Sequence, residues 1–184
     1  MKIVETEIPG VVIFEPRVFG DERGFFVETF RRQWLEQAGI EADFIQDNQS
    51  RSRKGVLRGL HYQTEHTQAK LVRVSRGAAF DVAVDVRRGS PTFGRWVGAV
   101  LDDKSHHQFY VPAGFAHGFC VLSDEADFNY KCTDYWHPQS ETGILWNDPA
   151  IGIRWPDIGQ ERLLSDRDRA LPALAEQGRL LSYS

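Results

Sequence analysis

Residues 56–63, VLRGLHYQ, carry an arginine and a histidine in a run that otherwise suits the core of a β-sheet. Strict alternation along a strand would place Arg58 and His61 on opposite faces. Gly59 lies between them, and a glycine is where a β-bulge costs least. A buried guanidinium also needs an anionic partner. We therefore predict an irregular strand in which both side chains reach one pocket, rather than a histidine that only fills the core.

Residues 109–122, FYVPAGFAHGFCVL, place His117 shortly after a turn at Pro112 and Gly114. The order Pro-x-Gly-x-x-His is similar to the second motif of cupin barrels, in which a first motif supplies a His-x-His pair to a metal. Here the first motif reads HYQ, and Gln63 stands in place of the second histidine. Because a set of three histidine ligands is incomplete, we expect no metal in the site.

Two further segments carry groups suited to acid–base chemistry. In residues 129–136, NYKCTDYW, a tyrosine can donate a proton where an anion develops, and Tyr135 and Trp136 offer flat faces to a base or a sugar ring. Asp168, in LLSDRDRALP, would hold the tautomer of His61 if the fold brings the two together. The simpler alternatives are an aromatic strand and a solvated helix start.

Polar side chains in the N-terminal third predict contacts to an anionic ligand. DERGFFVE supplies Arg23 and Glu28, and QDNQSRS supplies Gln46 and Asn48. The planar fork of an arginine suits a diphosphate because it bonds two oxygens at once. The alternative is a turn, an edge strand and a polar loop without a ligand.

Short β-like runs cut by Gly, Pro, Asp and Ser make up most of the chain. We expect strands within residues 11–19, 24–30, 56–63, 69–77, 78–87, 95–102, 107–114, 117–123 and 126–136. Around Val82 and Val84, apolar residues share one face, with Asp81 and Asp85 opposite. Residues 30–40 predict a short helix, and SDRD predicts the start of another. The pattern predicts an all-β jelly-roll barrel with short peripheral helices, whose mouth can hold a small ligand.

The length and charge of the chain limit the possible functions. Its 184 residues predict a single domain, 1–184. A net charge of −4 argues against a general nucleic-acid binder or a membrane-surface protein. The two cysteines, Cys120 and Cys132, fit neither a disulfide framework nor a zinc spacing. The N-terminal residues have no apolar signal core, and no run reaches the length of a membrane span, so we expect a cytoplasmic protein.

Eight segments, in order across nearly the whole chain, are similar to the dTDP-4-dehydrorhamnose 3,5-epimerase family, a group of metal-free cupins. They are RGFFVETF, QDNQSRS, GVLRGLHYQ, QAKLVRVSRGAAFDVAVDVRRGSPTFG, YVPAGFAHGF, YKCTDYW, ETGILWNDPAIGIRWP and LSDRDRALP. The resemblance implies a jelly-roll barrel, a homodimer, no cofactor, and dTDP-4-dehydro-6-deoxy-D-glucose as substrate.

The resemblance also implies roles for individual residues. His61 matches the general base, Asp168 its dyad partner, Tyr130 the acid and Lys70 the lysine beside the substrate ketone. The expected substrate-binding residues are Arg23, Glu28, Gln46, Asn48, Arg58, His117, Tyr135, Trp136, Glu141 and Arg167. The chain departs from the common family pattern at Cys132, where threonine is usual, and at Arg167, where lysine is usual.

The chemistry of these residue types fits an epimerase. A ketone at C4 acidifies the protons on C3 and C5, so a base can remove one, a cation can stabilise the enolate, and an acid on the opposite face can return a proton. Three alternatives remain at this point. One is an epimerase that acts on a single centre, another is a metal-dependent cupin, and the third is a sugar-nucleotide binding module without activity.

Overall fold

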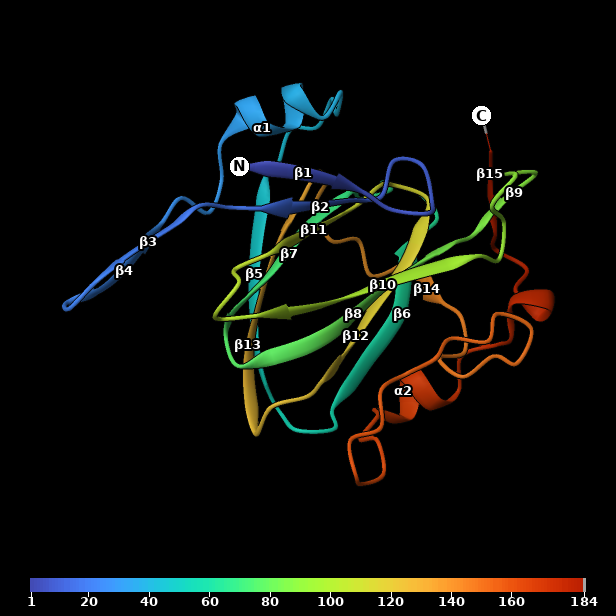
Figure 1. Cartoon of the computed structure of the whole chain (residues 1–184). Coiled ribbons are helices and arrows are strands. Elements are labelled where there is room, and N and C mark those ends of the chain that lie inside the picture. Colours follow the sequence, from blue (N-terminus) through green and yellow to red (C-terminus); the bar gives the residue numbers. More distant parts are fainter. Residues whose placement is uncertain (184) are drawn as a thin grey trace.

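Two antiparallel sheets face each other in the computed structural model, which describes residues 1–183 (Figure 1). The six-stranded sheet has the order β1 (Lys2–Glu5), β2 (Val12–Glu15), β11 (Gln108–Val111), β7 (Lys70–Arg76), β13 (Glu125–Cys132) and β5 (Gln46–Arg53). The five-stranded sheet has the order β10 (Trp96–Asp102), β8 (Ala78–Asp85), β12 (Phe115–Val121), β6 (Leu57–Gln63) and β14 (Glu141–Gly143). The all-β barrel predicted from the sequence is confirmed.

The remaining elements lie at the periphery. They are the hairpin β3 (Val18–Asp21) and β4 (Gly24–Val27), the parallel pair β9 (Arg87–Arg88) and β15 (Leu181–Ser182), the helices α1 (Arg32–Gln37) and α2 (Asp166–Arg169), and the 3₁₀ helix η1 (Leu174–Glu176). In Figure 1, α1 lies at one end of the six-stranded sheet and α2 lies beside β6. Within residues 1–183, none of these helices has the length and apolar character to cross a membrane.

The strand β8 is buried on both faces. Its Ala79 and Ala83 pack into the core between the sheets, together with Phe109, Phe119 and other side chains. The alternate residues, including Val82, pack against the C-terminal part of the chain on the outer side of the five-stranded sheet. The two faces predicted for this strand are confirmed. Because the face that carries Asp81 points to the interior, that carboxyl is fully buried.

Several element boundaries differ from those that the sequence pattern predicts. The run 11–19 divides at Pro16 into β2 and β3, since proline cannot continue the ladder of hydrogen bonds. The first helix is shorter than 30–40, and it ends before Gly39, whose φ is +67°. The polar segment 46–53 is an edge strand, β5, and not a loop, because it pairs with β13 along its whole length.

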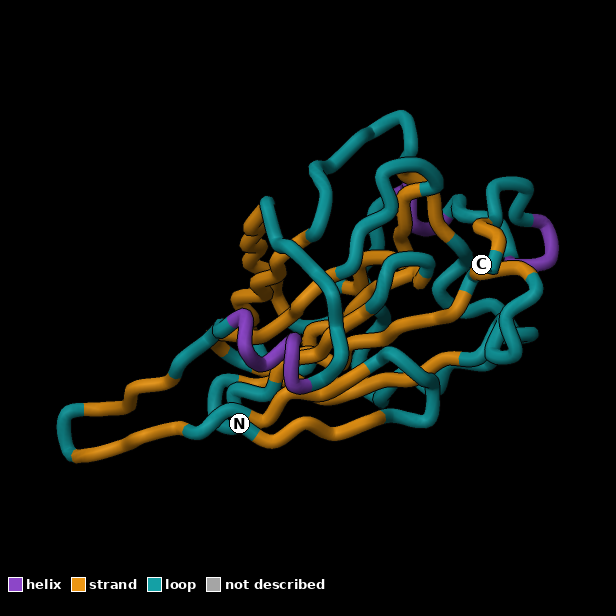
Figure 2. Tube along the Cα trace, turned by 90° about the horizontal axis from the view of Figure 1, so that it is seen from above, coloured by secondary structure: helices purple, strands orange, loops and turns teal. Residues whose placement is uncertain are grey.

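The hairpin β3–β4 projects away from the barrel (Figures 1 and 2). Its ladder joins only its own two strands. Phe25 and Phe26 are 61% and 65% exposed, and Phe19 is also exposed. Three phenylalanines on one projecting ribbon form an apolar surface that this chain alone leaves in contact with solvent.

Candidate active site

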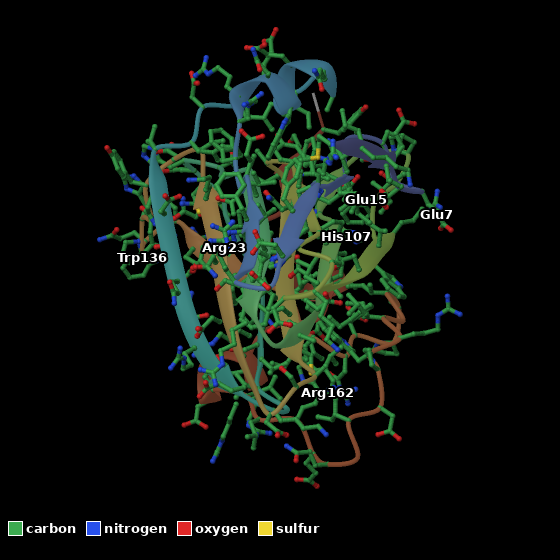
Figure 3. All side chains as sticks on the ribbon, turned by 60° about the vertical axis from the view of Figure 1, so that its left-hand side comes forward. Glu7, Glu15, Arg23, His107, Trp136 and Arg162 are labelled. Carbon is green, nitrogen blue, oxygen red and sulfur yellow. The ribbon has the colours of Figure 1, made fainter. Side chains whose placement is uncertain are left out.

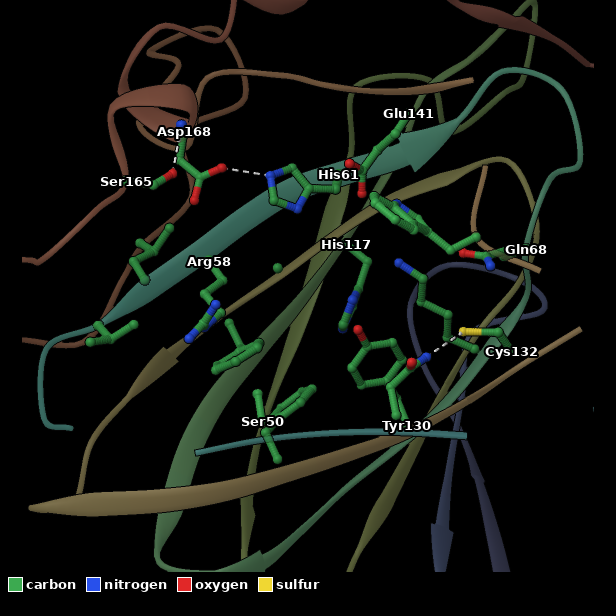
Figure 4. A pocket seen from close by; sticks show the side chains of 18 of the residues that line it. Ser50, Arg58, His61, Gln68, His117, Tyr130, Cys132, Glu141, Ser165 and Asp168 are labelled. Carbon is green, nitrogen blue, oxygen red and sulfur yellow. Dashed lines mark hydrogen bonds and ion pairs between the residues drawn. The ribbon is translucent and has the colours of Figure 1, made fainter. Parts of the chain in front are cut away.

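A cavity of about 860 Å³ lies between the two sheets (Figure 4). It is lined by residues of β5, β6, β7, β12, β13 and β14, by the segment 163–168, and by loop residues that include Tyr135 and Trp136. The lining includes every site residue predicted from the sequence except Arg23 and Glu28. These residues are His61, Lys70, Tyr130, Asp168, Gln46, Asn48, Arg58, His117, Tyr135, Trp136, Glu141 and Arg167.

Gly59 allows Arg58 and His61 to reach the same cavity. The register of β6 against β12 shifts between these two residues, as at a β-bulge. Gly59 has a φ of +118°, and a Cβ atom there would lie 2.6 Å from the Cα atom of Gly118. The irregularity predicted at Gly59 is therefore confirmed, and it is the reason why two neighbouring polar residues can point into one interior.

His61 forms a dyad with Asp168. The imidazole Nε2 lies 2.6 Å from Oδ1 of the carboxyl, which is buried at the first turn of α2 (Figure 4). Ser165 caps that turn by accepting a hydrogen bond from the backbone N–H of Asp168. Burial would raise the pKa of Asp168, but hydrogen bonds from His61, Ser165 and a backbone N–H lower it below its ordinary value. Asp168 is therefore a carboxylate that fixes the ring of His61.

Tyr130 reaches the cavity from the opposite sheet. His61 belongs to β6 of the five-stranded sheet, and Tyr130 belongs to β13 of the six-stranded sheet. Figure 4 shows the phenol ring and the imidazole entering the cavity from different sides. Burial raises the pKa of Tyr130, as do Cys132 and Glu141, while the Arg58 cation opposes them. The phenol is therefore protonated at neutral pH and can act as an acid.

Lys70 lies beside Tyr130, with Nζ 5.9 Å from the centre of the phenol ring. Its side chain is partly buried, and the loss of solvent around the ammonium lowers its pKa, although Cys132, Glu141 and Asp81 act in the opposite direction. A lysine in such surroundings supplies a cation that is poorly solvated. It would interact strongly with a negative oxygen placed next to it.

His117 is held by Asp81, a residue that the site prediction does not include. Nε2 of His117 lies 2.8 Å from Oδ1 of Asp81, and both side chains are buried. Burial raises the pKa of Asp81, and His117 and Lys70 act against that rise. The carboxyl thus bonds the histidine of the cavity and interacts electrostatically with the lysine. The sequence contains a signal for this contact, because an aspartate opposite the apolar face of a strand needs a polar partner.

Arg58 is more exposed than the prediction of a buried guanidinium assumes. Arg58 is exposed, and its Nε donates to the Ser52 hydroxyl at 3.2 Å. Within residues 1–183 no carboxylate forms an ion pair with it. Nearby, the buried hydroxyl of Ser50 has no hydrogen-bond partner in the described chain. Both groups remain available to a ligand.

Polar groups and aromatic rings alternate at the rim of the cavity. The Gln46 amide donates to Asn48 at 3.1 Å and accepts from the backbone N–H of Trp136 at 3.0 Å. These bonds hold the edge strand β5 against the loop that carries Tyr135 and Trp136, whose rings are both exposed. The rim can therefore present a flat ring face beside amide hydrogen-bonding groups.

Glu141 and Arg167 form an ion pair at the cavity wall, with 2.6 Å between the carboxylate and the guanidinium. Arg167 comes from α2, directly before Asp168. The pair therefore joins the C-terminal segment to β14 and helps to hold the helix that carries the dyad carboxylate.

Arg23 and Glu28 lie outside the cavity of this chain. Arg23 is at the tip of the β3–β4 hairpin, where it bonds to Asp21 (Figure 3). Glu28 follows the hairpin and pairs with Arg31 at 2.7 Å. The structure brings neither residue to the other predicted substrate contacts, because the hairpin points away from the barrel.

The cupin metal positions are engaged in other contacts. Gln63 donates to the backbone oxygens of His66 and Tyr135 and accepts from the backbone N–H of His137. His61 and His117 each bond to an aspartate through Nε2. The polar atoms at these three positions are thus used for contacts within the chain.

Comparisons with known proteins agree with this geometry. The family model described as dTDP-4-dehydrorhamnose 3,5-epimerase matches residues 5–176. The chain is 57% identical over 170 residues to the dTDP-4-dehydrorhamnose 3,5-epimerase of Shigella flexneri, covering 91% of this chain and 93% of that protein. The epimerase of Neisseria gonorrhoeae is 56% identical over 170 residues, but the match covers 92% of this chain and only 52% of that longer protein.

A solved structure extends the similarity to the arrangement of the whole chain. It is the dTDP-6-deoxy-D-glucose-3,5-epimerase of Legionella pneumophila in complex with dTDP-4-keto-L-rhamnose. The two chains are 53% identical and superpose with a TM-score of 0.96, covering 100% of this chain and 98% of the other.

Proposed function

The chain belongs to the dTDP-4-dehydrorhamnose 3,5-epimerase family, and on that premise we propose that it inverts C3 and C5 of dTDP-4-dehydro-6-deoxy-D-glucose. The product is dTDP-4-dehydro-L-rhamnose, an intermediate of dTDP-L-rhamnose biosynthesis. The observation that carries the mechanism is the placement of His61 and Tyr130 on opposite sheets around one cavity. A substrate carbon between them could lose its proton to His61 on one face and, once it is part of a planar enolate, gain a proton from Tyr130 on the other face.

Each inversion is a balanced exchange of protons. His61 takes the proton from the carbon next to the ketone, and the electrons of that C–H bond form the enolate. The Lys70 ammonium stabilises the negative oxygen, and Tyr130 then donates its phenolic proton to the opposite face of the carbon. Afterwards His61 has gained a proton and Tyr130 has lost one, so exchange with solvent must restore both. Asp168 stabilises the imidazolium that forms in between.

The remaining lining groups suit the nucleotide part of the substrate. Arg58 can pair with a diphosphate because no carboxylate of the described chain neutralises it. Trp136 and Tyr135 offer their exposed rings to the thymine, and Gln46 and Asn48 offer amides to its polar edge.

The two predicted contacts that lie outside the cavity support a homodimer. Arg23 lies on a hairpin whose Phe25 and Phe26 are exposed, so the hairpin needs an apolar surface to cover it. In the proposed dimer, this hairpin packs on a second copy and brings Arg23 and Glu28 to the partner's cavity. A monomer at micromolar concentration in analytical ultracentrifugation would contradict this assembly. A cytoplasmic location likewise remains a prediction.

The reaction in deuterium oxide tests the function directly. Conversion of dTDP-4-dehydro-6-deoxyglucose, coupled to a downstream NADPH-dependent reductase, should give product that carries deuterium at both C3 and C5. Label at one carbon alone would instead identify a single-centre epimerase. His61→Ala and Tyr130→Phe should each reduce turnover far more than they reduce affinity for dTDP. An equal loss of turnover and affinity would support a binding module, and inactivation by chelators would support a metal-dependent cupin.

A further inference from the structure

A second cluster of chemically active side chains lies at the rim of the cavity, apart from the groups that the epimerisation uses. His66 lies between β6 and β7, and Asp134 and His137 lie between β13 and β14. One ligand atom from each of the three residues lies within 4.8 Å of the other two. The two loops are distant in sequence, so only the fold brings these groups together.

The geometry of the cluster resembles that of a partly assembled metal site. The rings of His66 and His137 stack with centroids 3.9 Å apart, and Nδ1 of His66 lies 3.3 Å from Oδ2 of Asp134. Ligand atoms around a tetrahedral ion are roughly 3.3–3.6 Å apart when each bond is about 2.0–2.2 Å long. An ion binds an imidazole nitrogen in the plane of the ring, so one of the two stacked rings would have to turn out of the stack to close the site.

The backbone of the cluster is already fixed in place. The Gln63 side chain bonds the backbone oxygen of His66 at 2.6 Å and the backbone N–H of His137 at 2.6 Å. Gln68 donates to the backbone oxygen of Asp134 at 2.7 Å. These bonds reduce the conformational entropy that ligand binding would otherwise cost, because they order both loops in advance. The side chain of His66 is about half exposed, so an ion has a path from solvent.

We propose that His66, Asp134 and His137 bind one divalent transition-metal ion, with Zn²⁺ as the best fit to two imidazoles and one carboxylate. A solvent molecule would complete the coordination. The ion would join the β6–β7 loop to the β13–β14 loop. Because Asp134 and His137 flank Tyr135 and Trp136, it would hold those two rings in place at the rim of the cavity. The site takes no part in the proton transfers.

Zinc titration of the full-length, metal-free protein tests this proposal. Competition with a chromogenic chelator should give one equivalent of Zn²⁺ per chain. His137→Ala and His66→Asn should each weaken that binding at least about tenfold. Asparagine is chosen at position 66 because the residue has a φ of +54°, which asparagine tolerates. His107→Ala is the matched control, since His107 lies well away from Trp136 (Figure 3), and it should bind zinc like the parent chain.

A second measurement reports on the loops. Amide hydrogen exchange of residues 133–140 should slow when one equivalent of Zn²⁺ is added to the nucleotide-free protein, and it should not change in His137→Ala. Binding that is the same in all variants, or no stoichiometric binding below about 100 µM Zn²⁺, would overturn the proposal. Thermal unfolding of each metal-free variant confirms that it folds. Epimerase activity, measured separately without metal, keeps this result independent of the proposed function.

Discussion

Replacing Gly59 by alanine tests whether the bulge in β6 positions His61, the proposed base. A Cβ atom at this position would lie 2.6 Å from the Cα atom of Gly118 and 2.7 Å from the backbone oxygen of His117. Ordinary contact begins at about 3.4 Å, so β6 and β12 would have to separate by about 0.8 Å. Both obstructing atoms belong to the backbone and cannot move aside as a flexible side chain could.

The expected loss of stability has two parts. An alanine at a φ of +118° costs about 1–3 kcal/mol in backbone strain, and relief of the overlap costs a further 1–3 kcal/mol or so. A total of about 4 kcal/mol corresponds to a fall in Tm of roughly 8–16 °C for a chain of this size. Since a misplacement of about 1 Å in a reacting group can cost about 100-fold in rate, turnover should fall by that order.

The assay compares Gly59→Ala with Gly89→Ala. Gly89 also has a positive φ, +89°, but a Cβ atom there would meet nothing within 4 Å, so that variant carries backbone strain without the overlap. Differential scanning calorimetry should show the larger Tm loss for Gly59→Ala, and steady-state kinetics should show lost turnover in that variant alone. Equal Tm values and unchanged turnover would refute the role assigned to the bulge.

Three further predictions concern single groups in the cavity. Asp168→Asn removes the carboxylate bonded to His61, and steady-state turnover should fall about 100- to 10,000-fold; a loss of less than fivefold or so would exclude the dyad. Glu141→Gln removes an anion that raises the pKa of Lys70. Without this anion the pKa of Lys70 should fall, and the mechanism needs the lysine in its cationic form. The alkaline limb of the kcat/KM profile should therefore move to lower pH. An unshifted profile would contradict a catalytic ammonium. Cys132→Thr should change kcat by less than about threefold, because a threonine hydroxyl can accept the hydrogen bond that the Asn48 amide now donates to the sulfur. A larger change in kcat would indicate a role for the thiol.

The sequence predicts most of the inner site because its strands alternate regularly and carry few polar residues. Arg58 and His61 are conspicuous in an apolar run. The glycine between them predicts the bulge that lets both side chains face the same cavity. Asp81 was visible as a polar residue on the clearest strand, yet its partner His117 is 36 positions away. Pairings across that distance depend on strand order, which periodicity alone does not determine.

The outer parts of the site are less predictable for a different physical reason. The segment 46–53 has the composition of a loop, but β13 supplies a partner for its backbone and makes it an edge strand. The sequence around Arg23 does not show which cavity this residue can reach. Because its hairpin projects away from the barrel, Arg23 lies outside the cavity of its own chain. In the proposed dimer Arg23 would act in the partner's cavity, and a single sequence carries no signal of such a dependence.

The charges inside the barrel act against the loss of the Lys70 proton, which burial favours by lowering the pKa of the ammonium. Burial alone favours the neutral form of Lys70, and the nearby Asp81 and Glu141 carboxylates oppose this effect. Each carboxylate is itself held by a partner, Asp81 by His117 and Glu141 by Arg167. A negative oxygen that forms next to Lys70 would therefore meet a cation already surrounded by fixed charges, and little reorganisation would be needed as the enolate develops.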